Sequence, residues 1–299
     1  MVPASLVPST IDEAVVRAAN VASYKWDLLR QRPWAFFLNA FAGGAMVVFG
    51  AMLALSVSAG ITIPGLANLV MGLVFGFSLV IIMISGMCLI TADMALGVFG
   101  VFHRRMTWLQ YLYFIVMGYI GNFAGSMFFM YLVYLGGSVY NLPPWLLRAH
   151  AIAAAKTGMS DLNIFVLGIL CTWFLQTAMM LYYKAGTDIG KMMMAYYGPL
   201  AFVAGMTEHC IANIGFLALP LFQQKIFTKV TGVALTAAGP TARLSWGFAQ
   251  FGWAHNQLFT VMGNLVGGIV FVTLVFQFVS NPQRVMLLYR TTKARMLRI

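Results

Sequence analysis

Charged residues are scarce in this chain of 299 residues: Asp, Glu, Lys and Arg together make up 8% of it. Soluble domains contain about 25% charged residues, so the composition excludes an ordinary soluble protein. Hydrophobic residues make up 61%, and several uncharged runs exceed the roughly 20 residues that a helix needs to cross the hydrocarbon core of a bilayer. The sequence therefore predicts an all-α polytopic membrane protein embedded in lipid.

Cysteine is also rare, and Cys88, Cys171 and Cys210 all lie inside apolar segments. Their spacing matches neither a metal site nor a disulfide framework, so we interpret them as small apolar core thiols. Residues 1–33 lack the short apolar core and cleavage site of a secretory signal. No metal and no cofactor are predicted.

Six apolar segments are separated by polar links, and they lie at residues 34–58, 65–102, 108–136, 162–183, 192–222 and 256–280. Residues 34–282 therefore form the predicted six-span transmembrane domain. Residues 1–33 are predicted to form a cytoplasmic amphipathic helix, helical from about residue 11 to 29. Residues 283–299 are predicted to be a basic cytoplasmic tail.

Basic residues outnumber acidic ones, 18 to 7, and their distribution predicts the orientation. With six spans both termini lie on one side, and that side carries 13 of the 18 Lys and Arg residues. Cytoplasmic loops are enriched in Lys and Arg, so both termini are predicted to be cytoplasmic in a plasma (inner) membrane. Because this bias accounts for the net charge of +11, binding of nucleic acid is not predicted.

Two of the six segments are predicted to be broken helices. Residues 65–102 as one helix would run about 57 Å, nearly twice the ~30 Å hydrocarbon core. Gly86, Thr91 and Asp93 interrupt the apolar pattern of this segment, and Glu208, His209 and Asn213 interrupt the fifth. Unwound backbone at membrane depth requires protein or a water-filled cavity to satisfy it.

The two halves of the chain resemble each other. Gly121-Asn122-x-x-Gly125 in the third segment is matched by Gly263-Asn264-x-x-Gly267 in the sixth. Ala-Asp-Met at 92–94 is echoed by Ala-Asn-Ile at 212–214. Three spans followed by three invert the second half, so the sequence predicts a 3+3 inverted repeat with broken helices 2 and 5, a plan typical of channels and secondary transporters. The Gly-x-x-x-Gly pairs predict close helix contacts.

The pair Glu208-His209 is the strongest indication of function, because ionisable residues within a membrane span usually face a cavity, a pathway or a partner. Imidazole has an unperturbed pKa near ~6.5, so His209 can donate a hydrogen bond to an anion or exchange a proton with it. Glu208 would repel anions, and we expect it to accept hydrogen bonds from His209 or from unwound backbone. Both residues are predicted to lie near the membrane midplane.

Other polar residues leave alternatives open. Asn213 could orient the imidazole or join two helices, and Thr91 could contact an anion or cap the helix that follows. Lys156, just before the fourth segment, could attract anions or simply be solvated. Phe75, Leu79 and Phe202 are, by composition alone, packing residues.

These motifs resemble those of the formate/nitrite transporter family, over about residues 12–282. The resemblance rests on Gly205-x-x-Glu208-His209-x-x-Ala212-Asn213, on both Gly-Asn motifs, on the six spans and on Thr91 in the broken second span. It implies an aquaporin-like protomer with its own pore, a homopentamer, and transport of a small monovalent anion such as formate, nitrite, hydrosulfide or lactate.

The resemblance also implies roles for individual residues. His209 matches the central histidine, Thr91 the threonine of a mobile loop, Lys156 the basic residue of the outer vestibule and Asn213 a polar partner of the histidine. Apolar constrictions on either side of the histidine match Phe75, Leu79 and Phe202. Asn122 and Asn264, with Glu208, are expected to support the breaks.

Three positions depart from the family pattern. Thr172 stands where Asn is usual in Cys-Asn-Trp, Thr207 replaces an aromatic residue, and Cys210 replaces Ser. Thr172 is therefore included in the expected pathway, where Thr172 and Thr207 change polarity and bulk.

Three functions follow for testing. The first is a channel or proton-linked transporter for small monovalent anions, formate foremost. The second is a neutral-solute channel, which lacks the expected paired Asn-Pro-Ala motifs here. The third, an intramembrane enzyme, lacks Gly-x-Ser-x-Gly and His-Glu-x-x-His, and we predict that the protein is not an enzyme.

Overall fold

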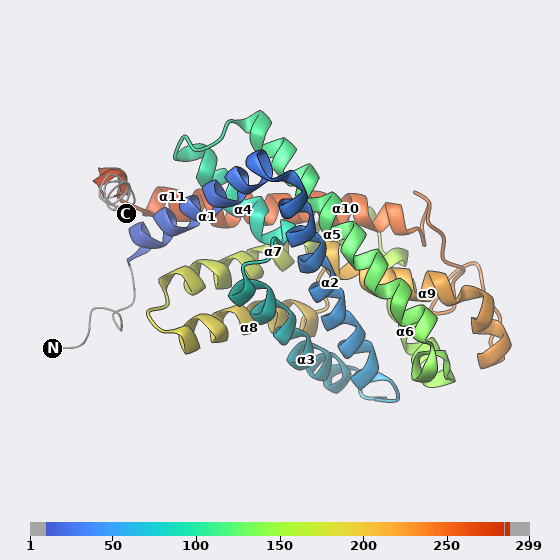
Figure 1. Cartoon of the computed structure of the whole chain (residues 1–299). Coiled ribbons are helices and arrows are strands. Elements are labelled where there is room, and N and C mark those ends of the chain that lie inside the picture. The colour runs from blue at the N-terminus through green and yellow to red at the C-terminus, as the bar shows by residue number, and fades with distance from the viewer. Residues whose placement is uncertain (1–9, 284, 288–299) are drawn as a thin grey trace.

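The computed structural model describes residues 10–283 and 285–287, and within this part the chain is built from helices and loops (Figure 1). Six apolar helices are long enough to cross a membrane, as predicted. They are α2 (Pro33–Ser58), α3 (Pro64–Ser85), α5 (Trp108–Gly136), α7 (Asp161–Lys184), α9 (Cys210–Thr231) and the run Trp253–Val279. That last run comprises α10 (Trp253–Gly268), a π-helical turn (Ile269–Leu274) and α11 (Val275–Val279).

The described residues also form four further α-helices: α1 (Ile11–Gln31), α4 (Ile90–Phe102), α6 (Pro143–Gly158) and α8 (Asp188–Ala204). A short 3-10 helix (Ser138–Asn141) precedes α6. Thr10 caps α1 with a capping box, which explains why the helix begins one residue later. The bounds differ from the prediction mainly after the fifth span, because α9 continues to Thr231 and shortens the link from 223–255 to 232–252. Of the predicted basic tail, all but residues 283 and 285–287 lies outside the described part.

Both predicted breaks are present. Helix α3 ends at Ser85, and Gly86 then adopts a left-handed conformation with φ of +72° before α4 begins at Ile90. In the second half α8 ends at Ala204, and α9 begins at Cys210. The first break resolves the excess length of the second segment, and the second lies at the polar residues that interrupt the fifth.

Asn122 of α5 forms hydrogen bonds with backbone groups that the first break leaves without helical partners. Its side-chain oxygen accepts a hydrogen bond from the Ile90 amide at 2.8 Å, and its Nδ2 donates to the carbonyl oxygens of Cys88 (2.9 Å) and Ala40 (2.6 Å). One buried amide thus holds the start of α4, the loop before it and helix α2 together.

Asn264 of α10 repeats this arrangement at the second break. Its oxygen accepts from the Cys210 amide at 2.9 Å, and its Nδ2 donates to the carbonyl oxygens of Glu208 (2.8 Å) and Gly168 (2.9 Å). The inverted repeat therefore extends to individual hydrogen bonds. These bonds explain why both Gly-Asn motifs contain asparagine.

The repeat extends further than the sequence indicated, because α6 is the counterpart of α1. Each of these helices precedes its half's first span and packs on the helix after the break, α1 on α4 and α6 on α9. Each also supplies a buried lysine to an ion pair: Lys25 with Asp93 and Lys156 with Glu208, both at 2.6 Å. Helix α6 lies between the third and fourth predicted segments, where the sequence predicted no helix.

The Gly-x-x-x-Gly pairs mark close helix contacts, as predicted. A Cβ atom at Gly125 of α5 would lie 1.9 Å from the carbonyl oxygen of Phe41 in α2, so only glycine permits this approach.

We expect Gly125→Ala to lower the free energy of unfolding by about 1–3 kcal/mol, because the backbones of α2 and α5 must move apart. Thermal unfolding in detergent measures it. Gly136→Ala on the same helix meets open space and is the matched control; equal midpoints for the two variants would contradict the prediction.

Candidate functional site

A narrow cavity of about 20 Å³ lies beside the second break, where α3, α6, α8 and α9 meet. It is lined by Met71, Ile152, Lys156, Phe202, Val203, Met206, Thr207, His209, Ala212, Asn213 and Phe216. A volume of this size holds about one water-sized group. Four residues of the predicted pathway thus line the same cavity: His209, Lys156, Asn213 and Phe202.

His209 is the N-cap residue of α9, and its ring is held from three directions. Its Nδ1 accepts a hydrogen bond from the Ala212 amide at 3.1 Å, and its Nε2 lies 2.9 Å from Oγ1 of Thr91. Because Nδ1 accepts, a neutral ring carries its proton on Nε2 and donates it to the Thr91 hydroxyl. The ring also stacks on Phe202, with centroids 4.8 Å apart and an angle of 12° between the planes.

Thr91 comes from the other half of the repeat, and this contact joins the two breaks. Helix α4 begins at Ile90, so Thr91 lies inside its first turn and does not cap it. The Thr91 carbonyl accepts a hydrogen bond from Gln176 of α7. When the hydroxyl oxygen accepts from His209, its own proton remains available for another acceptor.

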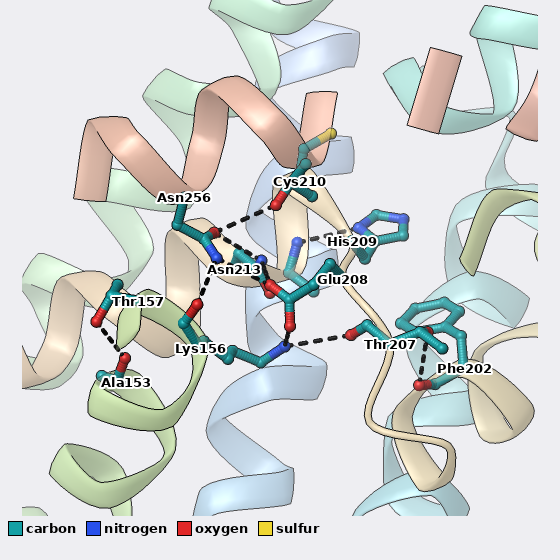
Figure 2. Close-up of polar contacts among 12 residues, drawn as sticks. Ala153, Lys156, Thr157, Phe202, Thr207, Glu208, His209, Cys210, Asn213 and Asn256 are labelled. Atoms are coloured by element: carbon teal, nitrogen blue, oxygen red, sulfur yellow. Dashed lines mark hydrogen bonds and ion pairs between the residues drawn. The ribbon is translucent and has the colours of Figure 1, made fainter. Parts of the chain in front are cut away.

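Glu208 faces away from His209 and belongs to a separate polar cluster (Figure 2). Its Oε1 pairs with Lys156 Nζ at 2.6 Å, and its Oε2 accepts from the Nδ2 atoms of Asn213 (2.5 Å) and Asn256 (3.0 Å). We expected Glu208 to accept from His209 or from unwound backbone, and this was wrong: side chains of α6, α9 and α10 contact both carboxylate oxygens. Adjacent residues in extended backbone point in opposite directions, which separates the pair.

Lys156 is buried and paired with Glu208, so it is neither a free cation of the vestibule nor a solvated lysine. Its Nζ donates to Glu208 and to the Thr207 carbonyl oxygen at 3.2 Å, and it lies 6.0 Å from the centre of the Phe216 ring. Asn213 likewise meets Glu208 and Asn256 and makes no side-chain hydrogen bond to His209 among the described residues. Of the two interpretations for Asn213, joining helices matches its contacts.

The three apolar residues of the expected constrictions lie on two facing helices. Phe202 of α8 contacts Phe75 of α3 edge to face, with ring centroids 5.6 Å apart, and Phe75 stacks on Phe216 at 6.3 Å. Leu79 is buried one turn beyond Phe75 on α3. Phe202 and Phe216 line the cavity beside His209, and Phe75 packs against both rings.

Thr172 lies apart from the cavity. Its hydroxyl donates to the carbonyl oxygens of Asn264 at 2.8 Å and Gly168 at 3.2 Å, inside the contact between α7 and α10. A Cβ atom at Gly267 would lie 2.3 Å from this hydroxyl. Thr172 therefore supports the helix contact that carries the second break.

Sequence reasoning missed Asn256, Gln176 and Phe216. Asn256 donates to both the Glu208 carboxylate and the Lys156 carbonyl oxygen, at 3.0 Å each, and so completes the cluster. Its sequence signal was a polar residue at the very start of the predicted sixth span. Within residues 10–283 and 285–287, no group of three or more His, Cys, Asp or Glu side chains is arranged to hold a metal ion.

A six-span helical protomer, whose two broken helices meet end to end at a buried polar contact, defines a multi-pass membrane channel or transporter. The sequence matches the formate/nitrite transporter family over residues 12–278. The chain therefore belongs to this family, as the motifs predicted.

Relatives of known name support the assignment. The nitrite transporter NirC of Escherichia coli (strain K12) is 27% identical over 271 residues, which cover 91% of each chain. The formate channel FocA of Haemophilus influenzae is 28% identical over 284 residues, 93% of this chain and 96% of that one. Among solved structures, an FNT family ion channel superimposes with a TM-score of 0.76 at 25% identity, covering 90% of this chain and 99% of that chain. A pentameric formate channel shares the fold, with a TM-score of 0.69 at 23% identity over 86% of this chain.

Proposed function

We propose that this protein conducts small monovalent anions, formate foremost, through the cavity beside His209. The observation that carries the proposal is the contact between Thr91 and His209, which brings the first turns of α4 and α9 together from opposite halves of the fold. Helix N-termini carry partial positive charge, so two of them facing each other favour an anion between them.

The side chains at this contact would compensate an anion for lost hydration. The Nε2 proton of a neutral His209 and the hydroxyl proton of Thr91 are both donors that can turn toward a carboxylate or nitrite oxygen. Rotation of Phe202 away from Phe75 would open the constriction. The proposal includes the movement of a proton with the anion through His209, because the imidazole side chain has an unperturbed pKa near neutral pH.

The buried cluster sets the charge of the vestibule. Lys156 alone would hold an anion tightly, and Glu208 alone would exclude it. Their ion pair, with Asn213 and Asn256 on the second carboxylate oxygen, leaves the region close to neutral and fixes the backbone on which His209 sits. We propose that this cluster positions the histidine and keeps net charge out of the pathway beside it.

Uptake into liposomes tests the substrate. Formate, nitrite, hydrosulfide and lactate should be compared at two pH values, with glycerol as the neutral control. We expect formate uptake to exceed glycerol uptake by at least about tenfold, because an anion gains from the helix termini and a neutral solute gains little. Equal rates for glycerol and formate would favour a neutral-solute channel, and faster nitrite uptake would make nitrite the main substrate.

The proposal includes a homopentamer in the inner membrane, with both termini in the cytoplasm. Exposed apolar residues along α3, α5 and α7 give each protomer surfaces for lipid or for neighbouring copies. Sedimentation or native mass spectrometry of the purified protein measures the number of copies. Accessibility of a cysteine introduced near residue 283 reports the orientation.

A further inference from the structure

Helix α6 carries a second cation toward the cavity, Arg148, to which neither the family motif nor the charge distribution assigned a role. Residues 148, 152 and 156 are spaced by four, so they share one face of the helix. Ile152 and Lys156 line the cavity. Arg148 lies two turns away, about 12 Å along the helix axis from Lys156.

The guanidinium is in contact with the cavity wall. Its Nη2 donates to Sδ of Met71 at 3.2 Å, and Met71 lines the same cavity from α3. Its Nε donates to Oγ of Ser58 at 3.2 Å, at the end of α2. These two contacts orient the planar group behind Met71, beside the cavity that Ile152 and Lys156 line.

Arg148 has no carboxylate partner among the described residues. On its side of the breaks only two acidic residues occur, and both are occupied: Glu208 by Lys156 and Asp161 by His255. The partners that Arg148 does have, a hydroxyl and a thioether, are neutral. Burial lowers the pKa of the Arg148 guanidinium by removing hydration, and no negative charge offsets this loss.

We propose that Arg148 is an entry site that captures planar oxyanions, such as formate and nitrite, before they reach His209. With Nε and one Nη2 hydrogen engaged, the edge formed by Nη1 and Nη2 remains for two parallel hydrogen bonds to the two oxygens of such an anion. Met71 is unbranched and flexible, so it can move aside as the anion passes from Arg148 to the cavity. This inference rests on the proposed anion function and adds a selective step to it.

The test measures initial formate and nitrite uptake against concentration, for the unaltered chain, Arg148→Gln and Arg148→Lys. At about 0.01 M ionic strength, we expect Arg148→Gln to raise the half-saturating concentration about five- to tenfold, with the maximal rate within about twofold. Arg148→Lys keeps the charge without the paired donors, so a rise of about two- to threefold is expected. At about 0.5 M salt the difference should shrink below about twofold.

Arg243→Gln is the matched control, since Arg243 is an exposed arginine in the 232–252 loop and does not line the cavity. Its half-saturating concentration should equal that of the unaltered chain. Uptake by Arg148→Gln with unchanged half-saturation would overturn the entry site alone. A fall in maximal rate and thermal stability without a change in half-saturation, in both Arg148 variants, would also overturn it and make Arg148 a clamp between α2 and α6. Failure of the unaltered chain to take up either anion would overturn the anion function as well.

Discussion

Replacing His209 with Phe is expected to reduce formate uptake about 10- to 100-fold. The substitution keeps a flat ring that can stack on Phe202, as the imidazole does at 4.8 Å. It removes both ring nitrogens, and with them the hydrogen bond to Thr91 and the donor proposed for the anion. A hydrogen bond to a charged group contributes about 1.5–3 kcal/mol, and each 1.4 kcal/mol changes a rate about tenfold.

Initial uptake into liposomes at two pH values measures this effect. His103→Phe is the control, because His103 follows the far end of α4 and does not line the cavity; its uptake should stay within about twofold. His209→Gln separates hydrogen bonding from proton transfer, since an amide donates but does not titrate. We expect it to keep part of the flux. Undiminished uptake by His209→Phe would show that the anion passes elsewhere.

Breaking the ion pair between Lys156 and Glu208 is expected to destabilise the protein by about 3–5 kcal/mol in either single variant, Lys156→Met or Glu208→Gln. Both side chains are almost fully buried, with exposed fractions of 7% and 0%. Removing one partner leaves the other as an uncompensated charge, which is costly at this depth. Glu208→Gln also weakens the cluster that holds the backbone of His209, so flux should fall with stability.

The double variant tests whether the two residues act as a pair. Because it leaves no buried charge, Lys156→Met with Glu208→Gln should be more stable than either single variant, although Asn213 and Asn256 then lose a charged acceptor. Thermal unfolding in detergent supplies the four midpoints. Lys191→Met removes an exposed pair with Asp188, whose side chain is 88% exposed, and should change stability by less than about 1 kcal/mol. Additive losses from the two buried substitutions would argue against coupling.

The helix breaks were predictable because glycine or ionisable residues interrupt long apolar segments. Gly86 and the pair Glu208-His209 interrupt otherwise uncharged spans, and the structure ends or begins a helix within one or two residues of each. The Gly-Asn motifs were also correctly associated with close helix contacts. Helix α6 was missed because it is too short and too mixed in polarity to be recognised as a span.

The candidate site was harder, since its partners are far apart in sequence. Lys156 and Glu208 are 52 residues apart, and Thr91 and His209 are 118 apart. A motif shows that such residues matter but not which of them touch. The expectation that Glu208 contacts His209 failed for this reason: adjacency in sequence suggested a pair, whereas extended backbone directs the two side chains to opposite sides.

The sequence by itself determined that the chain crosses a membrane six times, that two spans break, and that the halves repeat in inverted orientation. These features depend on hydropathy, length and local backbone chemistry, which each segment carries alone. Only the tertiary structure decided that His209 meets Thr91 and that Glu208 pairs with Lys156. It also placed Arg148 beside the same cavity without a carboxylate partner among the described residues. The contact of His209 with Thr91 depends on the inverted packing of the two halves. The Lys156–Glu208 pair lies within the second half and depends on the packing of α6 against α9, which brings residues from distant segments together.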